Sequence, residues 1–200
     1  MLDRMQARMF DWGAARHSRH PDRVLAVLGL RTGDRIADWG SGGGYYSLRF
    51  AREVGPEGKV FAVDINPAFL GFVRDRAKNA RLENVETVPV PGLASRIPAS
   101  SLDLLFCRNV YHHLSDRTSL FRTLAGYLKP AGRVAIIDWL PGGSRFSGPP
   151  PDHRTAPDTI LAELTAAGYF ELECPDFLKG QSFLIFGWKK DQLPPAPEIY

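Results

Sequence analysis

Short apolar runs and longer amphipathic segments alternate along the chain. Apolar runs bounded by turn residues are typical of buried strands, and segments with helical spacing are typical of helices that cover a sheet. The runs that predict strands are 35–39, 59–64, 85–90, 102–107, 133–139, 169–174 and 181–188, and the segments that predict helices are 44–54, 67–80, 115–128 and 157–167.

The order of these elements predicts the fold. Strands that alternate with helices form a parallel sheet buried on both faces. The last two runs, 169–174 and 181–188, follow each other with no helical segment between them. We therefore expect a doubly wound, Rossmann-like α/β fold with a seven-stranded, mostly parallel sheet and an antiparallel C-terminal hairpin at one edge.

Helix boundaries are marked by capping and breaking residues. Asn66 followed by Pro67 is an N-cap with proline at the first helical position, and Pro157 with Asp158 starts the last predicted helix. Ser115 predicts the start of the helix over 115–128, and the stretch 128–132 (LKPAG) predicts its end.

Composition places the chain among ordinary globular proteins. Its 44% hydrophobic and 24% charged fractions fit one domain. No run approaches the roughly 18 apolar residues of a membrane span, and the start of the chain lacks the apolar region of a secretory signal. We expect a cytoplasmic protein in which an N-terminal helical segment (1–30) packs on a core domain (31–190) that precedes a flexible tail (191–200).

The net charge of +3 is localised rather than spread. Residues 1–31 hold six arginines and three aspartates, so the rest of the chain is balanced. This favours a solvated helix face there, with a basic stripe for an anionic substrate or RNA as the alternative. Cys107 and Cys174 lack metal-ligand spacing, and we expect two buried thiols.

A glycine-rich loop follows the first predicted strand, in the stretch RIADWGSGGGYYSLRF (35–50). Such a loop lets the backbone approach a ligand at the carboxyl end of a parallel sheet. The dinucleotide fingerprint would need a small third residue where Tyr45 stands, and no Gly-Lys-Ser/Thr follows as a P-loop requires. The pattern that fits is D-x-G-x-G-x-G, at Asp38, Gly40, Gly42 and Gly44. Asp64 lies 20 residues past Gly44, at the end of the second predicted strand.

In these residues the chain resembles the class I S-adenosylmethionine-dependent methyltransferases. The resemblance covers about residues 20–190 and rests on four segments in order. They are DWGSGGG with the later VFAVDINP, then SLDLLFCRNVYHHL, YLKPAGRVAIIDW and LAELTAAGYF. It implies a small-molecule methyltransferase, similar to the enzymes that methylate quinones and sterols, with S-adenosylmethionine as its cofactor.

The resemblance also implies which residues bind the cofactor. Asp38 would face its amino group, the helix-start amides its carboxylate, Asp64 both ribose hydroxyls and Ile65 the adenine ring. Many relatives carry an acid after the third strand for the adenine amino group. Residues 90–95 of this chain contain no acid. The adenine amino group would therefore be bound by backbone groups near Gly92 and Leu93, or by Ser95. The residues expected to bind the cofactor are Asp38, Gly40, Ser41, Gly42, Gly44, Asp64, Ile65, Gly92, Leu93, Arg108 and Asn109. Two structural alternatives remain: Asp38 as a strand-end carboxylate held by loop amides, and Asp64 as a helix cap working with Asn66.

The loop after the fourth predicted strand argues against nucleic-acid substrates. It lacks the Asn/Asp-Pro-Pro-aromatic sequence of base-amino methyltransferases, and Cys107 follows Phe106 rather than the proline of a cytosine-5 enzyme. His112 and His113 lie in this loop and are the catalytic candidates, either as a general base or only as residues that cap and pack the next helix. We expect no metal site, because adjacent histidines rarely ligate one ion.

Other features leave alternatives open. Loop 140–156, with Arg154, could close over a substrate, and Met5, Met9, Phe10 and Trp12 could form another wall or simply pack on the domain. A non-catalytic cofactor-binding domain is the alternative to an enzyme, and Tyr45 argues against a nicotinamide-dependent reductase. We expect a small-molecule substrate and a monomer or homodimer.

Overall fold

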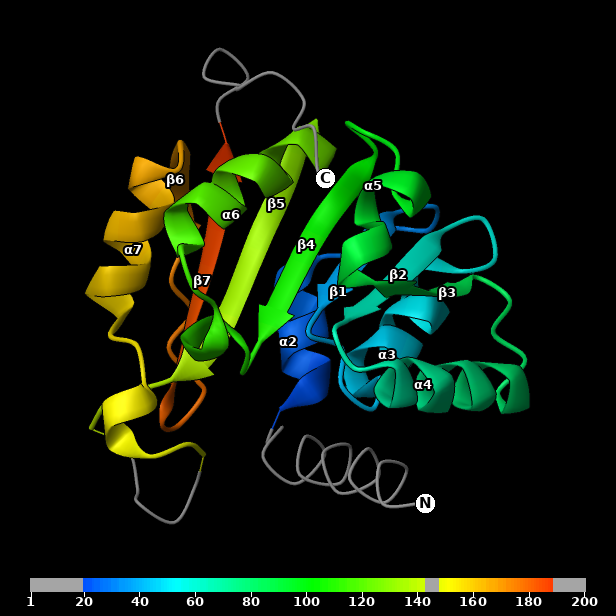
Figure 1. The fold of residues 1–200 in the computed structure, drawn as a ribbon, viewed down its shortest axis with the longest axis horizontal. Helices are drawn as coiled ribbons and strands as arrows, with labels where there is room; N and C mark the ends of the chain where they lie inside the picture. The colour runs from blue at the N-terminus through cyan, green and yellow to red at the C-terminus, as the bar shows by residue number, and fades with distance from the viewer. Residues whose placement is uncertain (1–19, 143–147, 189–200) are drawn as a thin grey trace. The chain divides into compact units, whose positions relative to one another are not determined.

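The computed structural model describes residues 20–142 and 148–188. It contains a seven-stranded, mostly parallel sheet with flanking helices, which confirms the predicted fold class (Figure 1). The chain divides into two compact units, Met1–Pro98 and Ala99–Tyr200. The expected tail (191–200) and the segment with Met5, Met9, Phe10 and Trp12 lie outside the described residues.

The first unit contains three parallel strands in the order β3-β2-β1. Its strands are β1 (Arg35–Trp39), β2 (Lys59–Asp64) and β3 (Val85–Pro89), and its helices are α2 (Pro21–Leu28), α3 (Tyr45–Val54), α4 (Pro67–Asn79), α5 (Leu93–Arg96) and a 3₁₀ turn, η1 (Val90–Gly92). The register pairs Ile36 with Val60 and Val63 with Val88. Sequence predicts these strands to within one residue because each is a short apolar run.

Two helices cover this three-stranded part. α3 connects β1 to β2 and α4 connects β2 to β3, both moving in the same direction across the sheet. Because such crossovers are right-handed, they place both helices on one face. The predicted cap of α4 is confirmed, since the Asn66 side chain accepts a hydrogen bond from the amide of Ala68 at 2.9 Å.

The second unit contains four strands in the order β4-β5-β7-β6. Its strands are β4 (Leu102–Arg108), β5 (Leu128–Trp139), β6 (Tyr169–Glu173) and β7 (Gln181–Trp188), and its helices are α6 (Arg117–Leu124), α7 (Pro157–Ala166) and the 3₁₀ turns η2 (Tyr111–His113), η3 (Ala125–Tyr127) and η4 (Pro151–His153). β4 and β5 are parallel, and β7 pairs antiparallel with both β5 and β6, so the predicted hairpin is confirmed.

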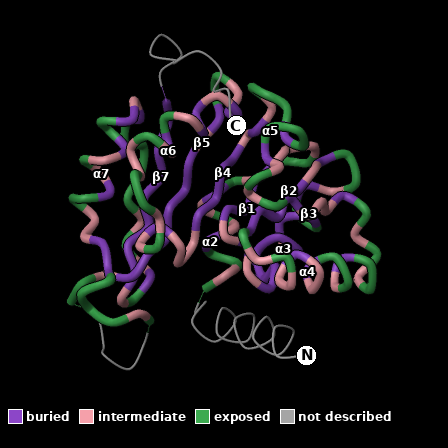
Figure 2. Tube along the Cα trace, in the orientation of Figure 1, coloured by how far each residue is buried: buried purple, intermediate pink, exposed green. Residues whose placement is uncertain are grey.

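Burial follows position in the sheet. Every residue of β7 is buried, whereas β6 at the edge exposes all but Tyr169 (Figure 2). Phe170 and Leu172 on β6 are among the exposed large apolar side chains. Since both faces of β7 are buried, its residues 183–188 form a nearly continuous apolar run in the sequence.

The predicted helix over 115–128 is wrong at both ends. The helix α6 begins after Asp116, whose φ of 42° is left-handed, so Ser115 is not the cap residue. After the 3₁₀ turn η3, the stretch 128–132 belongs to β5. Lys129 stabilises this early part of the strand: its ammonium contacts Asp103 at 2.7 Å and its carbonyl accepts from the Trp188 indole at 2.8 Å.

Two further findings concern the expectations from composition. Cys107 is buried as expected, but Cys174 is exposed because it follows the edge strand β6. Within residues 20–142 and 148–188, no helix has the length and apolar character that crossing a bilayer demands.

Candidate functional site

The glycine loop joins β1 to α3 in the first unit. Gly40, Gly42 and Gly44 have positive φ values of 72°, 51° and 78°, a backbone conformation that favours glycine. The amides of Gly40 and Ser41 both donate to the carbonyl of Val63, at 2.9 and 3.0 Å. The loop is therefore fixed against the end of β2.

Asp64 connects this loop to the next helix. Its carboxylate accepts from the Gly42 amide and from the Asn66 amide, both at 2.9 Å. Since Asn66 caps α4, one carboxylate sets both the loop and the helix start. Asp64 therefore works with Asn66 at the start of α4, as the structural alternative expected. The same carboxylate also lies beside the glycine loop.

Asp38 is buried at the end of β1 and accepts a hydrogen bond from the Ser47 hydroxyl at 2.5 Å. Ser47 lies in the first turns of α3, so this bond ties the strand end to the helix that follows. The carboxylate that sequence predicts at this position is thus present beside the loop, held by a side chain of α3.

Two side chains near the loop have unusual surroundings. The Ser41 hydroxyl is buried, yet it has no hydrogen-bond partner among the described residues. Ile65, directly after Asp64, is 81% exposed. A buried polar atom without a partner is costly, and an isolated apolar side chain beside polar groups is typical of a ligand surface. A ligand with one polar and one flat apolar part fits both.

Gly42 and Gly44 have different surroundings. A Cβ added at Gly42 would meet nothing within 4 Å, whereas one at Gly44 would lie 2.8 Å from Cγ2 of Val73 on α4. Gly44 is therefore a packing residue between α3 and α4. Gly42 borders open space, where a ligand can approach the backbone.

The remaining residues expected to bind the cofactor lie at other strand ends. Gly92 and Leu93 join η1 to α5, where the Leu93 side chain is buried and the Gly92 carbonyl accepts from the Ser95 hydroxyl at 2.9 Å. Arg108 ends β4 in the second unit, and Asn109 follows it with φ of 55°. The structure thus brings Asp38, the glycine loop, Asp64 and Ile65 to neighbouring strand ends of the first unit.

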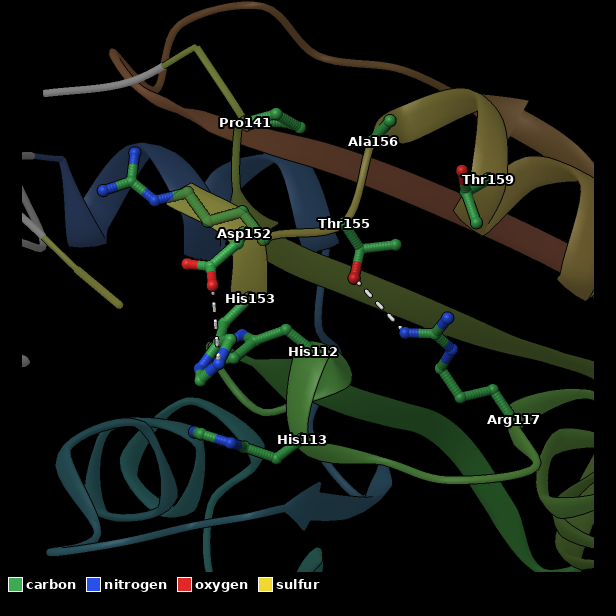
Figure 3. A pocket seen from close by; sticks show the side chains of 10 residues that line it. His112, His113, Arg117, Pro141, Asp152, His153, Thr155, Ala156 and Thr159 are labelled. Atoms are coloured by element: carbon green, nitrogen blue, oxygen red, sulfur yellow. Dashed lines mark hydrogen bonds and ion pairs between the residues drawn. The ribbon is translucent and has the colours of Figure 1, made fainter. Parts of the chain in front are cut away.

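The second unit contains a pocket of about 650 Å³ (Figure 3). It lies among η2, η4 and the starts of α6 and α7. Its walls carry several basic and hydroxyl side chains, and its lining residues are His112, His113, Arg117, Pro141, Asp152, His153, Arg154, Thr155, Ala156 and Thr159. Both catalytic candidates from the sequence therefore line one cavity.

Within residues 20–142 and 148–188, no three His, Cys, Asp or Glu side chains are grouped as a metal ion requires.

His112 is held by Asp138, a residue that the sequence analysis did not single out. Its Nδ1 lies 2.7 Å from Oδ1 of Asp138, and its main-chain amide donates to Oδ2 at 3.0 Å. The His112 side chain is 2% exposed and that of Asp138 is fully buried. The signal that could have found Asp138 is an acid at the carboxyl end of an otherwise apolar predicted strand.

His113 stacks beside His112, with ring centroids 4.1 Å apart. Desolvation lowers the pKa of His113, and the charge that His112 carries when protonated lowers it further. The neutral form of His113 is therefore favoured.

The arginines of the pocket are held by protein groups. Arg117 contacts Glu163 at 2.8 Å and Thr155 at 3.3 Å, as Figure 3 shows for Thr155. Arg154 is buried and donates to the carbonyls of Pro149 and Leu140, at 2.9 and 3.2 Å. Arg154 therefore links the two described parts of loop 140–156.

Known proteins are similar to this chain in sequence and in fold. A family model described as a methyltransferase domain matches residues 36–132. A ubiquinone/menaquinone biosynthesis C-methyltransferase, UbiE, of Pasteurella multocida is 29% identical over 117 residues, which are 58% of this chain and 44% of the relative. A demethylmenaquinone methyltransferase of Listeria welshimeri is 27% identical over 61% of this chain and 52% of the relative. The aligned part therefore spans about half the length of these curated relatives.

A solved structure extends the likeness over nearly the whole chain. The crystal structure of a SAM-dependent methyltransferase from Aquifex aeolicus aligns with a TM-score of 0.83 and 25% identity, covering 92% of this chain and 97% of that one. In sequence and in fold the chain is similar to the class I S-adenosylmethionine-dependent methyltransferases. The curated relatives described here are, by name, C-methyltransferases of quinone biosynthesis or demethylmenaquinone methyltransferases.

The two loop glycines give a matched stability prediction. Gly42→Ala is expected to lower the free energy of unfolding by about 1–2 kcal/mol, the cost of left-handed backbone for a residue with a Cβ. Gly44→Ala pays the same cost and must also displace Val73, which adds roughly 1–3 kcal/mol. Urea denaturation of both variants measures the difference. If both variants lost the same free energy of unfolding, Val73 on α4 would be able to move aside without a measurable cost.

The lowered pKa of His113 predicts a pH dependence of stability. The unfolded chain binds this proton more readily, so the favourable contribution of neutral His113 is present above about pH 6.5 and is lost as the pH falls below it. Between about pH 7.5 and 5.5, the Tm of His113→Gln should therefore fall less than that of the wild type. Parallel slopes for the two proteins would contradict the shift.

Proposed function

We propose that this chain transfers a methyl group from S-adenosylmethionine to a small-molecule acceptor. The observation that carries the proposal is Ile65, which is 81% exposed directly after the buried carboxylate of Asp64. An apolar surface next to a carboxylate suits an adenosine, whose ring is flat and whose ribose offers two hydroxyl donors. The similarity to S-adenosylmethionine-dependent methyltransferases supports the same ligand.

The residues of the first unit fit the parts of this cofactor. Asp64 would accept from the ribose hydroxyls, and Ile65 would lie against the adenine. Gly42 leaves room for the methionyl part to approach the backbone, and the unpartnered Ser41 hydroxyl offers it a hydrogen bond. Asp38 supplies negative charge for the ammonium group. Nothing in this set requires the third glycine of a dinucleotide site, whose place Tyr45 takes.

When bound, S-adenosylmethionine supplies a methyl carbon on a sulfonium: the acceptor's electron pair forms a bond to that carbon, and the carbon–sulfur bond breaks with its pair left on sulfur. The chain's contribution is to bind, align and keep out water, which can supply much of the rate. Within the first unit, Gly92 and Leu93 would complete the cofactor contacts through backbone groups.

The acceptor is proposed to enter the pocket of the second unit. A cavity of about 650 Å³ is within the range that takes a small organic molecule. Its histidines and hydroxyl groups suit an acceptor that carries oxygen atoms. The curated relatives include a ubiquinone/menaquinone C-methyltransferase and a demethylmenaquinone methyltransferase, so a quinol is the first acceptor to test.

Two measurements test the function. Calorimetry should show binding of S-adenosylmethionine and none of NADH, which separates a methyltransferase from a nicotinamide-dependent reductase. Labelled methyl groups should then pass to reduced demethylmenaquinone or to another component of a metabolite extract. Tight binding without any transfer would instead favour a non-catalytic cofactor-binding domain.

Asp64→Ala gives a residue-level prediction. Losing hydrogen bonds to a charged group should weaken S-adenosylmethionine binding by roughly 1.5–3 kcal/mol, which is about 10- to 150-fold in Kd. An analogue with a 2′-deoxyribose should bind the wild type poorly but bind Asp64→Ala about as well as the natural cofactor does. Calorimetry with both ligands measures this pattern.

The control for Asp64→Ala addresses its structural bonds. Because Asp64 also holds the amides of Gly42 and Asn66, the unfolding of the variant must be measured in parallel. Glu83→Ala removes an exposed acid from the same unit and should leave the Kd unchanged. If both proteins discriminated equally against the deoxy analogue, Asp64 would not contact the ribose.

A further inference from the structure

We propose that Asp138 is a positioning residue that orients His112, and not His113, as the base that takes a proton from the acceptor. This rests on the methyltransferase function proposed above. It adds a residue that the sequence analysis did not consider, and it narrows the acceptor to molecules that must lose a proton when they are methylated.

The contacts of Asp138 determine which nitrogen of His112 carries the proton. The carboxylate is fully buried and accepts from two main-chain amides, those of His112 at 3.0 Å and Trp139 at 2.7 Å. A buried carboxylate so surrounded is an acceptor, so the ring nitrogen 2.7 Å away must donate to it. Nδ1 of His112 therefore holds a proton, and in the neutral ring Nε2 carries the free lone pair.

That lone pair is on the side of the ring that Asp138 leaves open. His112 lines the pocket, and its side chain is 2% exposed, so its ring is held in one place among packed neighbours. Nδ1 is occupied by Asp138, and Nε2 is the ring nitrogen left to face a bound acceptor. An oriented and unprotonated imidazole nitrogen in a cavity is the arrangement that general-base catalysis needs.

His113 lacks such an orienting partner. Its main-chain amide donates to the Val110 carbonyl, and its ring stacks on His112, but within the described residues no hydrogen bond holds the His113 ring. The other charged or titratable groups that line the pocket are Arg117 and Arg154, which are held by protein groups, and Asp152 and His153, which lie 4.0 Å apart at η4. Of the three histidines, His112 alone is held by a buried carboxylate.

A built-in base indicates the chemical class of the acceptor. Methylation of a hydroxyl or a carbon acid releases a proton, whereas many amines and thiols need no base. In the proposed step, the acceptor's O–H or C–H proton passes to Nε2 of His112 and then to solvent, while the electron pair it leaves forms the bond to the methyl carbon. The structure therefore points to a phenol, enol or activated carbon atom.

The first test needs no substrate. The wild type is labelled with ¹⁵N at histidine, and the resonances of His112 are identified as those that disappear in His112→Gln. At neutral pH these resonances should show a protonated Nδ1 and an unprotonated Nε2. In Asp138→Asn, the amide would donate to Nδ1 and move the proton to Nε2, as the same change does in Ser-His-Asp enzymes. Asp152→Asn, which removes a charge from the same pocket, should change nothing.

Either of two results would overturn the positioning role. One is a wild-type His112 with its proton on Nε2, and the other is an unchanged tautomer in Asp138→Asn. The wild-type spectrum decides the first even if Asp138→Asn fails to fold. Neither measurement depends on the cofactor. If the chain bound no S-adenosylmethionine, the proposed function would be disproved, and the tautomer of His112 would still test whether Asp138 orients it.

The second test measures catalysis with reduced demethylmenaquinone of short side chain as acceptor. Asp138→Asn and His112→Gln should each lower kcat by about 10²- to 10⁴-fold and flatten the acidic limb of the pH profile, with the Kd for S-adenosylmethionine unchanged. Asp103→Asn, which removes a carboxylate paired with Lys129 in the same sheet, should leave kcat and its pH profile unchanged. An unchanged kcat and pH profile in Asp138→Asn would exclude the base role.

Discussion

A carboxylate taken out of water must be surrounded by donors, and this requirement organises the described parts of both units. Asp38, Asp64 and Asp138 end or nearly end their strands, and all three are buried. Each meets the cost of burial by binding the segment that comes next to it in space: α3 through Ser47, the glycine loop through Gly42, and η2 through His112. The strand ends and the site residues are thus positioned by the same bonds.

Sequence patterns predict the parts of this arrangement that depend on neighbours along the chain. The apolar runs predict the strands, and Asn66 with Pro67 predicts the start of α4. Asp64 was also recognisable, because an acid that ends the second strand shortly after a glycine loop lies at the ligand side of a parallel sheet. These inferences need only periodicity, capping and the common edge at which parallel strands end.

Features that depend on distant residues were not predictable. Ser115 is a good capping residue by type, yet the helix begins after Asp116 in a left-handed conformation. The stretch 128–132 looks like a helix stop, but its pairing with β4 and its bond to Trp188 make it strand. Asp138 and His112 are 26 residues apart, and their contact depends on how β5 is placed against η2. Only an acid in an apolar run marked the position.

The strand order of the second unit has a consequence for synthesis of the chain. β7 is inserted between β5 and β6, so the last described strand occupies an interior position of that sheet. When β6 leaves the ribosome, the strand it pairs with has not yet been made, and the apolar edge of β5 is bare. In the first unit, β2 and β3 each pair with the strand made just before them, so their pairing can form while synthesis continues. The sheet of the second unit is completed only when residues 181–188 are made, and until then the edge of β5 is open to pairing with other chains.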